Sequence, residues 1–252
     1  MNRDTGQGAL TAFGRRLLLA VDAKGYGGVD VLTQSQLQGA IQELVTRAAD
    51  AAGLDRERWE TQSAGDSLFA VLPEGASEPA LVDTFMRKLD AGLRAFNHQR
   101  LPSGWLRLRA AVHFGTASAG ANGFVGRAPV DIGRMLDSTV LRSALAAAPD
   151  ACLAVAVSSI VYDDVVREAY TTFRAQEFRE VRVEEKEYAG QVWIWVPGCD
   201  PHALDLRGTG SGRGAEQSVA KVGDIPTALR DTVVQNFHGT IHADGAVFGI
   251  SH

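Results

Sequence analysis

Two apolar runs, each next to an aspartate, constrain the fold of this chain most strongly. Residues 17–21 read Leu-Leu-Leu-Ala-Val and lead directly into Asp22, which a glycine-rich turn follows. Asp66 instead precedes an apolar run, at residues 68–72. The first run predicts a buried central strand that ends in a carboxylate, and the second predicts a hairpin with a carboxylate at its tip. If the two strands are neighbours, both carboxylates lie at one edge of the sheet.

Paired carboxylates without histidine or cysteine partners suit hard divalent cations such as Mg²⁺. Two such ions activate a hydroxyl group and neutralise a triphosphate. A single aspartate of this kind is more often a strand-end cap or a turn former. The pair Asp22 and Asp66, taken together with the flanking runs, favours a metal site.

Composition limits the classes of partner and the compartment. The chain has 252 residues, 45% of them hydrophobic, which allows a full core in one domain with an additional segment. A net charge of −5 and the lack of a Lys/Arg block argue against a DNA or RNA partner. The distant Cys152 and Cys199 match neither a metal site nor a disulfide framework. With no apolar run of membrane-spanning length, we expect a cytoplasmic protein without a membrane span.

The chain divides into four predicted segments. A polar lead-in at 1–13 precedes a domain at 14–198, a linker at 199–230 and a β-prone tail at 231–252. Polar and apolar residues alternate along the tail, and glycines interrupt the alternation. This pattern loosely resembles bacterial amyloid-type signalling segments. It therefore stays disordered, adds a strand to a protein partner, or self-assembles as a cross-β segment.

Hydrophobic periodicity predicts hairpins interleaved with helices inside the domain. This order predicts an α/β fold, an α+β sandwich with one mixed sheet and helices packed on it. The predicted strands are 15–22, the two that flank Asp66, 105–114, 152–157, 178–183 and 191–196; the predicted helices are 33–52 (with Thr33 as cap), 78–98, 129–148 and 159–170, and a glycine-rich loop is predicted at 115–126.

Four segments resemble the catalytic domain of class III nucleotidyl cyclases, the adenylate/guanylate cyclase family. The first is the aspartate pair with a helix between its members. Residues 108–115 look like the family's R-x-G-[IV]-H-x-G strand, and residues 126–137 look like its G-x-x-V-N-x-A-x-R-L helix start. Residues 181–186 look like the strand and turn that carry a phosphate-binding lysine. The resemblance spans residues 14–197 in the family's order, and is closest in character to stand-alone bacterial pyrimidine cyclases of antiphage signalling.

The resemblance implies a two-metal site. Asp22 and Asp66 would hold two Mg²⁺ or Mn²⁺ ions, one acting on the ribose 3′-hydroxyl and one on the triphosphate. The backbone from Ala23 to Gly25 would lie against the phosphates, where small residues allow close approach.

The resemblance also implies a head-to-tail homodimer with shared active sites. Arg134 of the partner chain would stabilise charge on the α-phosphate, and Lys186 of the partner chain would hold the terminal phosphates. The products would be a 3′,5′-cyclic nucleotide and pyrophosphate. In the alternative interpretation, Arg134 only solvates its helix or pairs with Asp137, and Lys186 lies in a salt-bridged surface turn.

The purine-reading positions of the family depart from its pattern. Gln62 stands at the base-reading lysine, Gly123 at the base-reading aspartate, and Val130 at the helix-start asparagine. The Gln62 amide both donates and accepts hydrogen bonds, so it could read a base, although it could equally face solvent.

Three interpretations follow from these departures. The enzyme reads a pyrimidine (UTP or CTP), which we slightly favour over ATP; it reads a purine through other groups; or it is a catalytically silent nucleotide-binding or scaffold module that works through its tail. A diguanylate-cyclase-like enzyme is disfavoured, because residues 64–68 lack the Gly-Gly-acidic-acidic-Phe turn.

Overall fold

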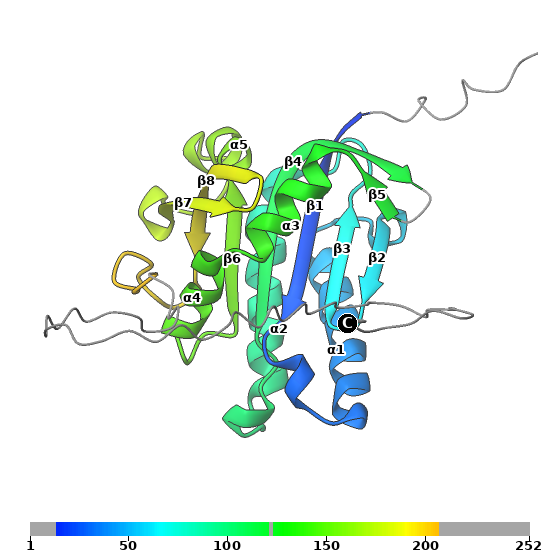
Figure 1. Ribbon diagram of the computed structural model, residues 1–252, viewed down its shortest axis with the longest axis vertical. Coiled ribbons are helices and arrows are strands. Elements are labelled where there is room, and N and C mark those ends of the chain that lie inside the picture. Colours follow the sequence, from blue (N-terminus) through cyan, green and yellow to red (C-terminus); the bar gives the residue numbers. More distant parts are fainter. Residues whose placement is uncertain (1–13, 121–122, 207–252) are drawn as a thin grey trace, which may run out of the picture. The chain divides into compact units, whose positions relative to one another are not determined.

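One mixed sheet forms the centre of the domain (Figure 1). The computed structural model describes residues 14–120 and 123–206, so the predicted lead-in, most of the predicted linker and the tail lie outside it. The strand order is β2-β3-β1-β4-β6-β8-β7, and β5 pairs with β4 alone. The strands are β1 (Gly14–Ala23), β2 (Glu60–Ala64), β3 (Ser67–Val71), β4 (Leu108–Gly120), β5 (Gly123–Val125), β6 (Leu153–Ser158), β7 (Arg179–Glu185) and β8 (Tyr188–Trp195).

Helices cover both faces of this sheet (Figure 1). Side chains alternate along β1, so Leu17, Leu19 and Val21 join one core while Leu18 and Ala20 join the other. The first core includes residues of α1 and α2, and the second includes residues of α3 and α4. The helical segments are α1 (Val31–Ala51), a π-helical turn (Ala80–Phe85) that leads into α2 (Met86–Asn97), α3 (Arg127–Leu136), α4 (Thr139–Ala147), and α5 (Ser159–Val161) with a π-helical extension (Tyr162–Arg167). The predicted α+β sandwich is confirmed.

Two helix boundaries differ from the prediction. The cap of α1 is Asp30 rather than Thr33, and its carboxylate accepts hydrogen bonds from the backbone N–H groups of Leu32 and Thr33 at 3.0 Å. The single helix predicted at 129–148 is in fact two helices. Ser138 separates them, because its hydroxyl accepts from Leu141 N at 3.2 Å and thereby starts α4.

The loop predicted at 115–126 is also wrong, because β4 continues to Gly120 and β5 follows at Gly123. The glycines allow close packing rather than a loop. A Cβ atom at Gly115 would lie 2.7 Å from Ala128 Cβ of α3, and one at Gly126 would lie 2.6 Å from the Thr116 carbonyl oxygen. Glycine therefore lets α3 approach this strand pair.

Packing continues past the predicted domain boundary at residue 198. Leu206 is buried in the core on the α3–α4 face. Arg179 of β7 donates to the carbonyl oxygens of Pro201 and Leu204, at 3.3 and 2.8 Å. Among the helices in residues 14–120 and 123–206, none is long and apolar enough to cross a membrane.

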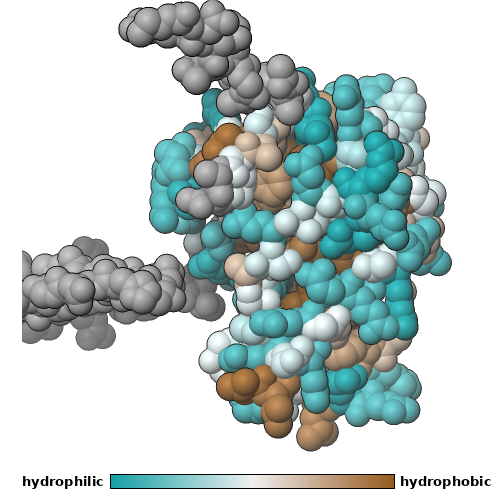
Figure 2. Space-filling model, turned by 90° about the vertical axis from the view of Figure 1, so that its right-hand side faces the viewer, coloured by the Kyte–Doolittle hydropathy of each residue, from teal (hydrophilic) through white to brown (hydrophobic). Residues whose placement is uncertain are grey.

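The surface combines polar and hydrophobic regions. Figure 2 shows a face on which polar residues predominate, with hydrophobic residues gathered near its lower end. Val31 and Leu32, in the first turn of α1, are each 77% exposed, and Leu101 is 78% exposed. Exposed apolar side chains therefore occur where the chain passes from β1 into α1.

Candidate active site

Asp22 lies near the end of β1, the central strand between β3 and β4. In the sheet register it stands between Ser67 of β3 and Arg109 of β4. Because side chains alternate along a strand, Asp22 shares the face of Leu18 and Ala20, on which α3 and α4 pack.

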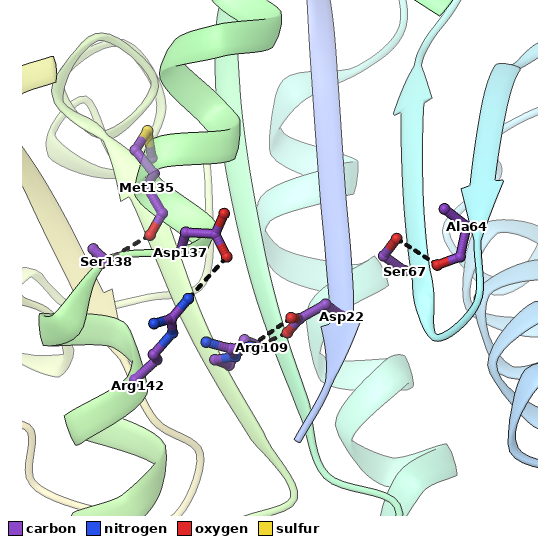
Figure 3. A network of polar contacts seen from close by, with 8 residues as sticks. All are labelled: Asp22, Ala64, Ser67, Arg109, Met135, Asp137, Ser138 and Arg142. Atoms are coloured by element: carbon purple, nitrogen blue, oxygen red, sulfur yellow. Dashed lines mark hydrogen bonds and ion pairs between the residues drawn. The ribbon is translucent and has the colours of Figure 1, made fainter. Parts of the chain in front are cut away.

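Asp66 lies in the tight turn between β2 and β3, next to Asp22's partner Ser67. Gly65 supplies the turn with a positive φ of 59°. The Ser67 hydroxyl closes the turn by donating to the Ala64 carbonyl oxygen at 2.8 Å (Figure 3). The predicted neighbourhood of β1 and the hairpin is thus confirmed, and it brings both aspartates to one end of the sheet.

The pKa of Asp22 is raised above its usual value, chiefly because burial removes water from the carboxylate. The negative charges of Asp66 and Asp137 raise the pKa further, while Arg109 opposes the shift. Desolvation therefore sets the direction of the shift, because Arg109 acts on Asp22 more strongly than either Asp66 or Asp137 does. Asp22 and Asp66 are two carboxylates beside one guanidinium, so a divalent cation suits the site on its charge as well as on its oxygen ligands.

Few other protein ligands are near this pair. Within the described ranges, no group of three or more histidine, cysteine, aspartate or glutamate side chains could hold a metal ion. Asp22 and Asp66 would therefore bind an ion only together with water, backbone or substrate oxygens. Mg²⁺ is commonly held in this way, by one or two carboxylates and substrate phosphates.

Arg109 is a site residue that sequence reasoning missed. Its Nε donates to Asp22 Oδ1 at 2.8 Å and its Nη2 to Asp22 Oδ2 at 2.5 Å (Figure 3). The two side chains are only 11% and 17% exposed. The arginine was visible in the segment 108–115, but its partner becomes apparent only once the register of β1 with β4 is known.

The loop after Asp22 offers less backbone than predicted. Ala23 is buried and still pairs with Leu108 of β4. The Lys24 N–H already donates to the Arg107 carbonyl oxygen at 2.9 Å. At Gly25, where φ is +83°, a Cβ atom would meet nothing within 4 Å. Backbone that a phosphate could approach therefore begins at Gly25.

The positions expected to read the base converge on one pocket of about 370 Å³. A Cβ atom on Gly123, where φ is +115°, would lie 2.3 Å from Gln62 Oε1, so the Gln62 amide rests directly on the glycine. The Phe69 and Phe124 rings lie 5.2 Å apart at the pocket. Its lining residues are Gln62, Ala64, Ser67, Phe69, Phe124, Pro129 and Val130. Because Ser67 is among them, the pocket adjoins the hairpin that carries Asp66.

Arg134 and the β7–β8 turn lie together. Arg134 Nη2 is 2.8 Å from Glu187 Oε1, and this hydrogen bond is the main cause of a raised Arg134 pKa. Glu187 follows Lys186, which takes a positive φ of 53° in the turn. In the alternative interpretation Arg134 pairs with Asp137, but the Asp137 carboxylate pairs with Arg142 at 3.1 Å instead (Figure 3).

The sheet register separates Lys186 from the aspartates of the same chain. Asp22 aligns across β4 with Ala154 of β6, next to the Val155–Trp195 pair. The β7–β8 turn lies at the other end of β8, immediately before Tyr188. The separation along the strand direction alone is roughly 26 Å at about 3.3 Å per residue. Lys186 therefore cannot reach the Asp22–Asp66 site of its own chain.

Comparison with known proteins gives a clear result at the level of structure. No protein-family model and no curated protein sequence matches the chain. A solved adenylate/guanylate cyclase/hydrolase from Silicibacter pomeroyi is similar with a TM-score of 0.50 at 18% identity, over 74% of this chain and 99% of that one. The guanylyl cyclase Cya2 is similar with a TM-score of 0.50 at 15% identity, over 77% and 98%.

A third similar structure is the guanylate cyclase domain of RhGC from Catenaria anguillulae in complex with GTP, with a TM-score of 0.50 at 15% identity, over 72% and 95% of the two chains. All three names describe cyclases of one structural type, and each match covers nearly the whole of the solved domain. The chain therefore has the fold of the class III nucleotidyl cyclase catalytic domain.

Proposed function

We propose that this chain is a nucleotidyl cyclase that converts a nucleoside triphosphate into a 3′,5′-cyclic nucleotide and pyrophosphate. The observation that carries the proposal is the meeting of Asp22 and Asp66 at one end of the sheet, beside the pocket that contains Gln62. Negative charge in excess of one arginine, oxygen ligands and an adjoining pocket are what a metal–triphosphate complex requires.

Asp22 and Asp66 would hold two Mg²⁺ or Mn²⁺ ions, which supply Lewis-acid activation of the 3′-hydroxyl and neutralisation of the phosphates. The carboxylates fix where these charges stand, while the backbone from Gly25 onward leaves room for the phosphates. Phosphoryl transfer of this kind needs little beyond positioning and electrostatic stabilisation.

Arg134 and Lys186 would come from a second copy of the chain. The separation of roughly 26 Å along the strands supports this assignment for Lys186, which cannot act on the metal site of its own protomer, and Glu187 of the same turn holds Arg134 beside it. In a head-to-tail homodimer the Arg134 and Lys186 region of each copy faces the aspartates of the other. Glu187 holds Arg134 within the single chain, and the substrate phosphates would replace it as the partner.

A pyrimidine triphosphate, UTP or CTP, is the preferred substrate in this proposal, ahead of ATP. The pocket supplies a single side-chain amide, from Gln62, between aromatic and aliphatic walls. Gly123 and Val130 offer no polar side chain where the family's purine-reading groups would be. A cyclic pyrimidine nucleotide would serve as a messenger in antiphage signalling, and residues 231–252, outside the described ranges, would contact a protein partner.

A catalytically silent scaffold is the competing function. The occupation of Asp22 by Arg109 and of Arg134 by Glu187 favours it, since both groups already have partners. Such a module would bind a nucleotide, or a partner through its tail, without turnover.

Incubation with each of ATP, GTP, CTP and UTP in the presence of Mn²⁺, followed by mass spectrometry of the products, decides between the two functions. The enzyme forms one 3′,5′-cyclic nucleotide, and Asp22→Asn or Asp66→Asn abolishes it. Ser63→Ala on the same hairpin is the matched control and keeps the activity. A folded dimer that turns over none of the four nucleotides would contradict the proposed activity and favour the scaffold.

A further inference from the structure

The ion pair between Asp22 and Arg109 uses both oxygens of the carboxylate that would bind a metal ion. Both carboxylate oxygens accept a hydrogen bond from the same guanidinium, at 2.8 and 2.5 Å. This bidentate geometry is the strong form of the arginine–carboxylate pair, and burial strengthens it. A divalent cation on the same oxygens would lie against the arginine's positive charge.

Among the residues that the structure describes, Asp22 is the carboxylate with which Arg109 forms an ion pair. Asp137, the other carboxylate that acts on Asp22 besides Asp66, is already paired with Arg142 at 3.1 Å. Arg109 therefore neutralises Asp22 by itself.

The guanidinium also carries an unused donor. Arg109 Nη1 is buried and has no hydrogen-bond partner in the part of the chain that the structure describes. A buried donor without a partner is costly, so an anion that satisfied it would gain the full benefit of the new contact. The polyphosphate chain of a substrate is such an anion.

We propose that Arg109 is a latch on Asp22 that makes metal binding depend on the triphosphate. In the nucleotide-free protein the arginine holds Asp22 and keeps the divalent cation out. The triphosphate draws the guanidinium away and satisfies Nη1, so that the Asp22 oxygens become available. Metal and triphosphate then bind cooperatively, each raising the affinity of the other by the same factor.

This inference rests on the proposed function, in which Asp22 is a metal ligand. It goes beyond that function by assigning an order of binding, in which the triphosphate releases Asp22 for the metal ion. Arg109 acts here as a positioning residue through Asp22. Its consequence is protection of the nucleotide-free site against divalent cations, which would otherwise bind the Asp22 and Asp66 carboxylates.

The test measures Mn²⁺ binding by the loss of the free-ion electron paramagnetic resonance signal, with no nucleotide present. Arg109→Lys keeps the charge but, with one ammonium group, no longer engages both oxygens in a fork. We expect Arg109→Lys to bind Mn²⁺ at least about tenfold more tightly than the unmodified protein. Arg142→Gln, which removes a charge from the adjacent pair without touching Asp22, is the matched control and shifts the affinity by less than about threefold.

A second measurement, of nucleotide binding, uses the unmodified protein and needs no variant. Calorimetric titration with 3′-deoxy-UTP and 3′-deoxy-CTP, which cannot cyclise, is run in EDTA and in Mn²⁺, and the latch predicts heat of binding even in EDTA. Equal Mn²⁺ affinity in Arg109→Lys and the unmodified protein would overturn the latch while Asp22→Asn still tests the metal site. Failure of every form to bind Mn²⁺, alone or with the 3′-deoxy form of any of the four nucleotides present, would overturn the proposed function and the latch together.

Discussion

Because Gln62 lies directly against Gly123, a substitution at Gly123 should alter how the pocket binds the base. Gly123→Ala adds one carbon atom at a position where φ is +115° and where that atom would lie 2.3 Å from Gln62 Oε1. Ordinary contacts of a Cβ atom begin near 3.4 Å, so the amide has to withdraw by about 1 Å. Gln62 is exposed, so its side chain can withdraw without moving the sheet.

Two separate costs follow from this one carbon atom. Holding alanine at a positive φ destabilises the fold by about 1–3 kcal/mol. Withdrawal of the amide removes one neutral hydrogen bond to the base, about 0.5–1.5 kcal/mol, which raises KM roughly two- to tenfold and leaves kcat nearly unchanged. The first cost appears in a melting curve and the second only in the kinetics.

A double-mutant cycle separates these effects. Gln62→Ala alone raises KM by the same two- to tenfold factor, with little change in the melting temperature. If Gly123→Ala acts on the base through Gln62, the double variant has the KM of Gln62→Ala rather than the product of both factors. Val125→Ala, which changes a side chain that is 57% exposed on the same short strand as Gly123, is the control for general disturbance of β5.

Additive effects of the two substitutions on KM would refute the reasoning, because they would mean that Gly123 and Gln62 act independently. An unchanged KM in Gln62→Ala would refute the assignment of the pocket to the base.

Three further predictions concern stability, pH and the metal site. The Asn97 side chain hydrogen-bonds to both the N–H and the carbonyl oxygen of Leu106, each at 2.8 Å, and Asn97→Ala removes both contacts. The free energy of unfolding, measured by urea titration, should fall by about 2–4 kcal/mol. An unchanged midpoint would contradict this. Burial lowers the pKa of His113 below its ordinary value near 6.5, so the unfolded chain binds the extra proton first and stability falls as the pH drops below about 6.5. His113→Gln should flatten the melting temperature between pH 7 and 5, and an unaltered slope would assign the acid sensitivity to other groups. Asp66→Ala should abolish Mn²⁺ binding in the presence of nucleotide while the melting temperature changes little, and retained binding would place the ion elsewhere.

The parts of the fold that depend on local patterns could be predicted from the sequence. The run 17–21 is continuous and apolar because β1 is central and buried on both faces, and the hairpin at Asp66 carries its own turn glycine. The predicted helix at 129–148 was wrong because residues around Ser138 keep a helical pattern, while the break depends on one buried hydroxyl.

Features that depend on distant contacts could not be predicted. Gly115 and Gly126 read as a loop, yet they allow α3 to pack against β4, which only the assembled structure reveals. The pairing of Arg109 with Asp22 likewise follows from strand register, and no local signal specifies it. The resemblance predicts that Gln62 and Gly123 occupy base-reading positions, whereas their direct contact is a property of the folded chain.

The central claim is that Asp22 and Asp66 of one chain act with Arg134 and Lys186 of another to cyclise a triphosphate. Mixing two inactive variants, Asp22→Asn and Lys186→Ala, tests it most directly by the yield of cyclic nucleotide. In a heterodimer one of the two shared sites is intact, so an equal mixture should recover about a quarter of the unmodified rate. A mixture that stays as inactive as its components, although heterodimers form, would contradict the shared site.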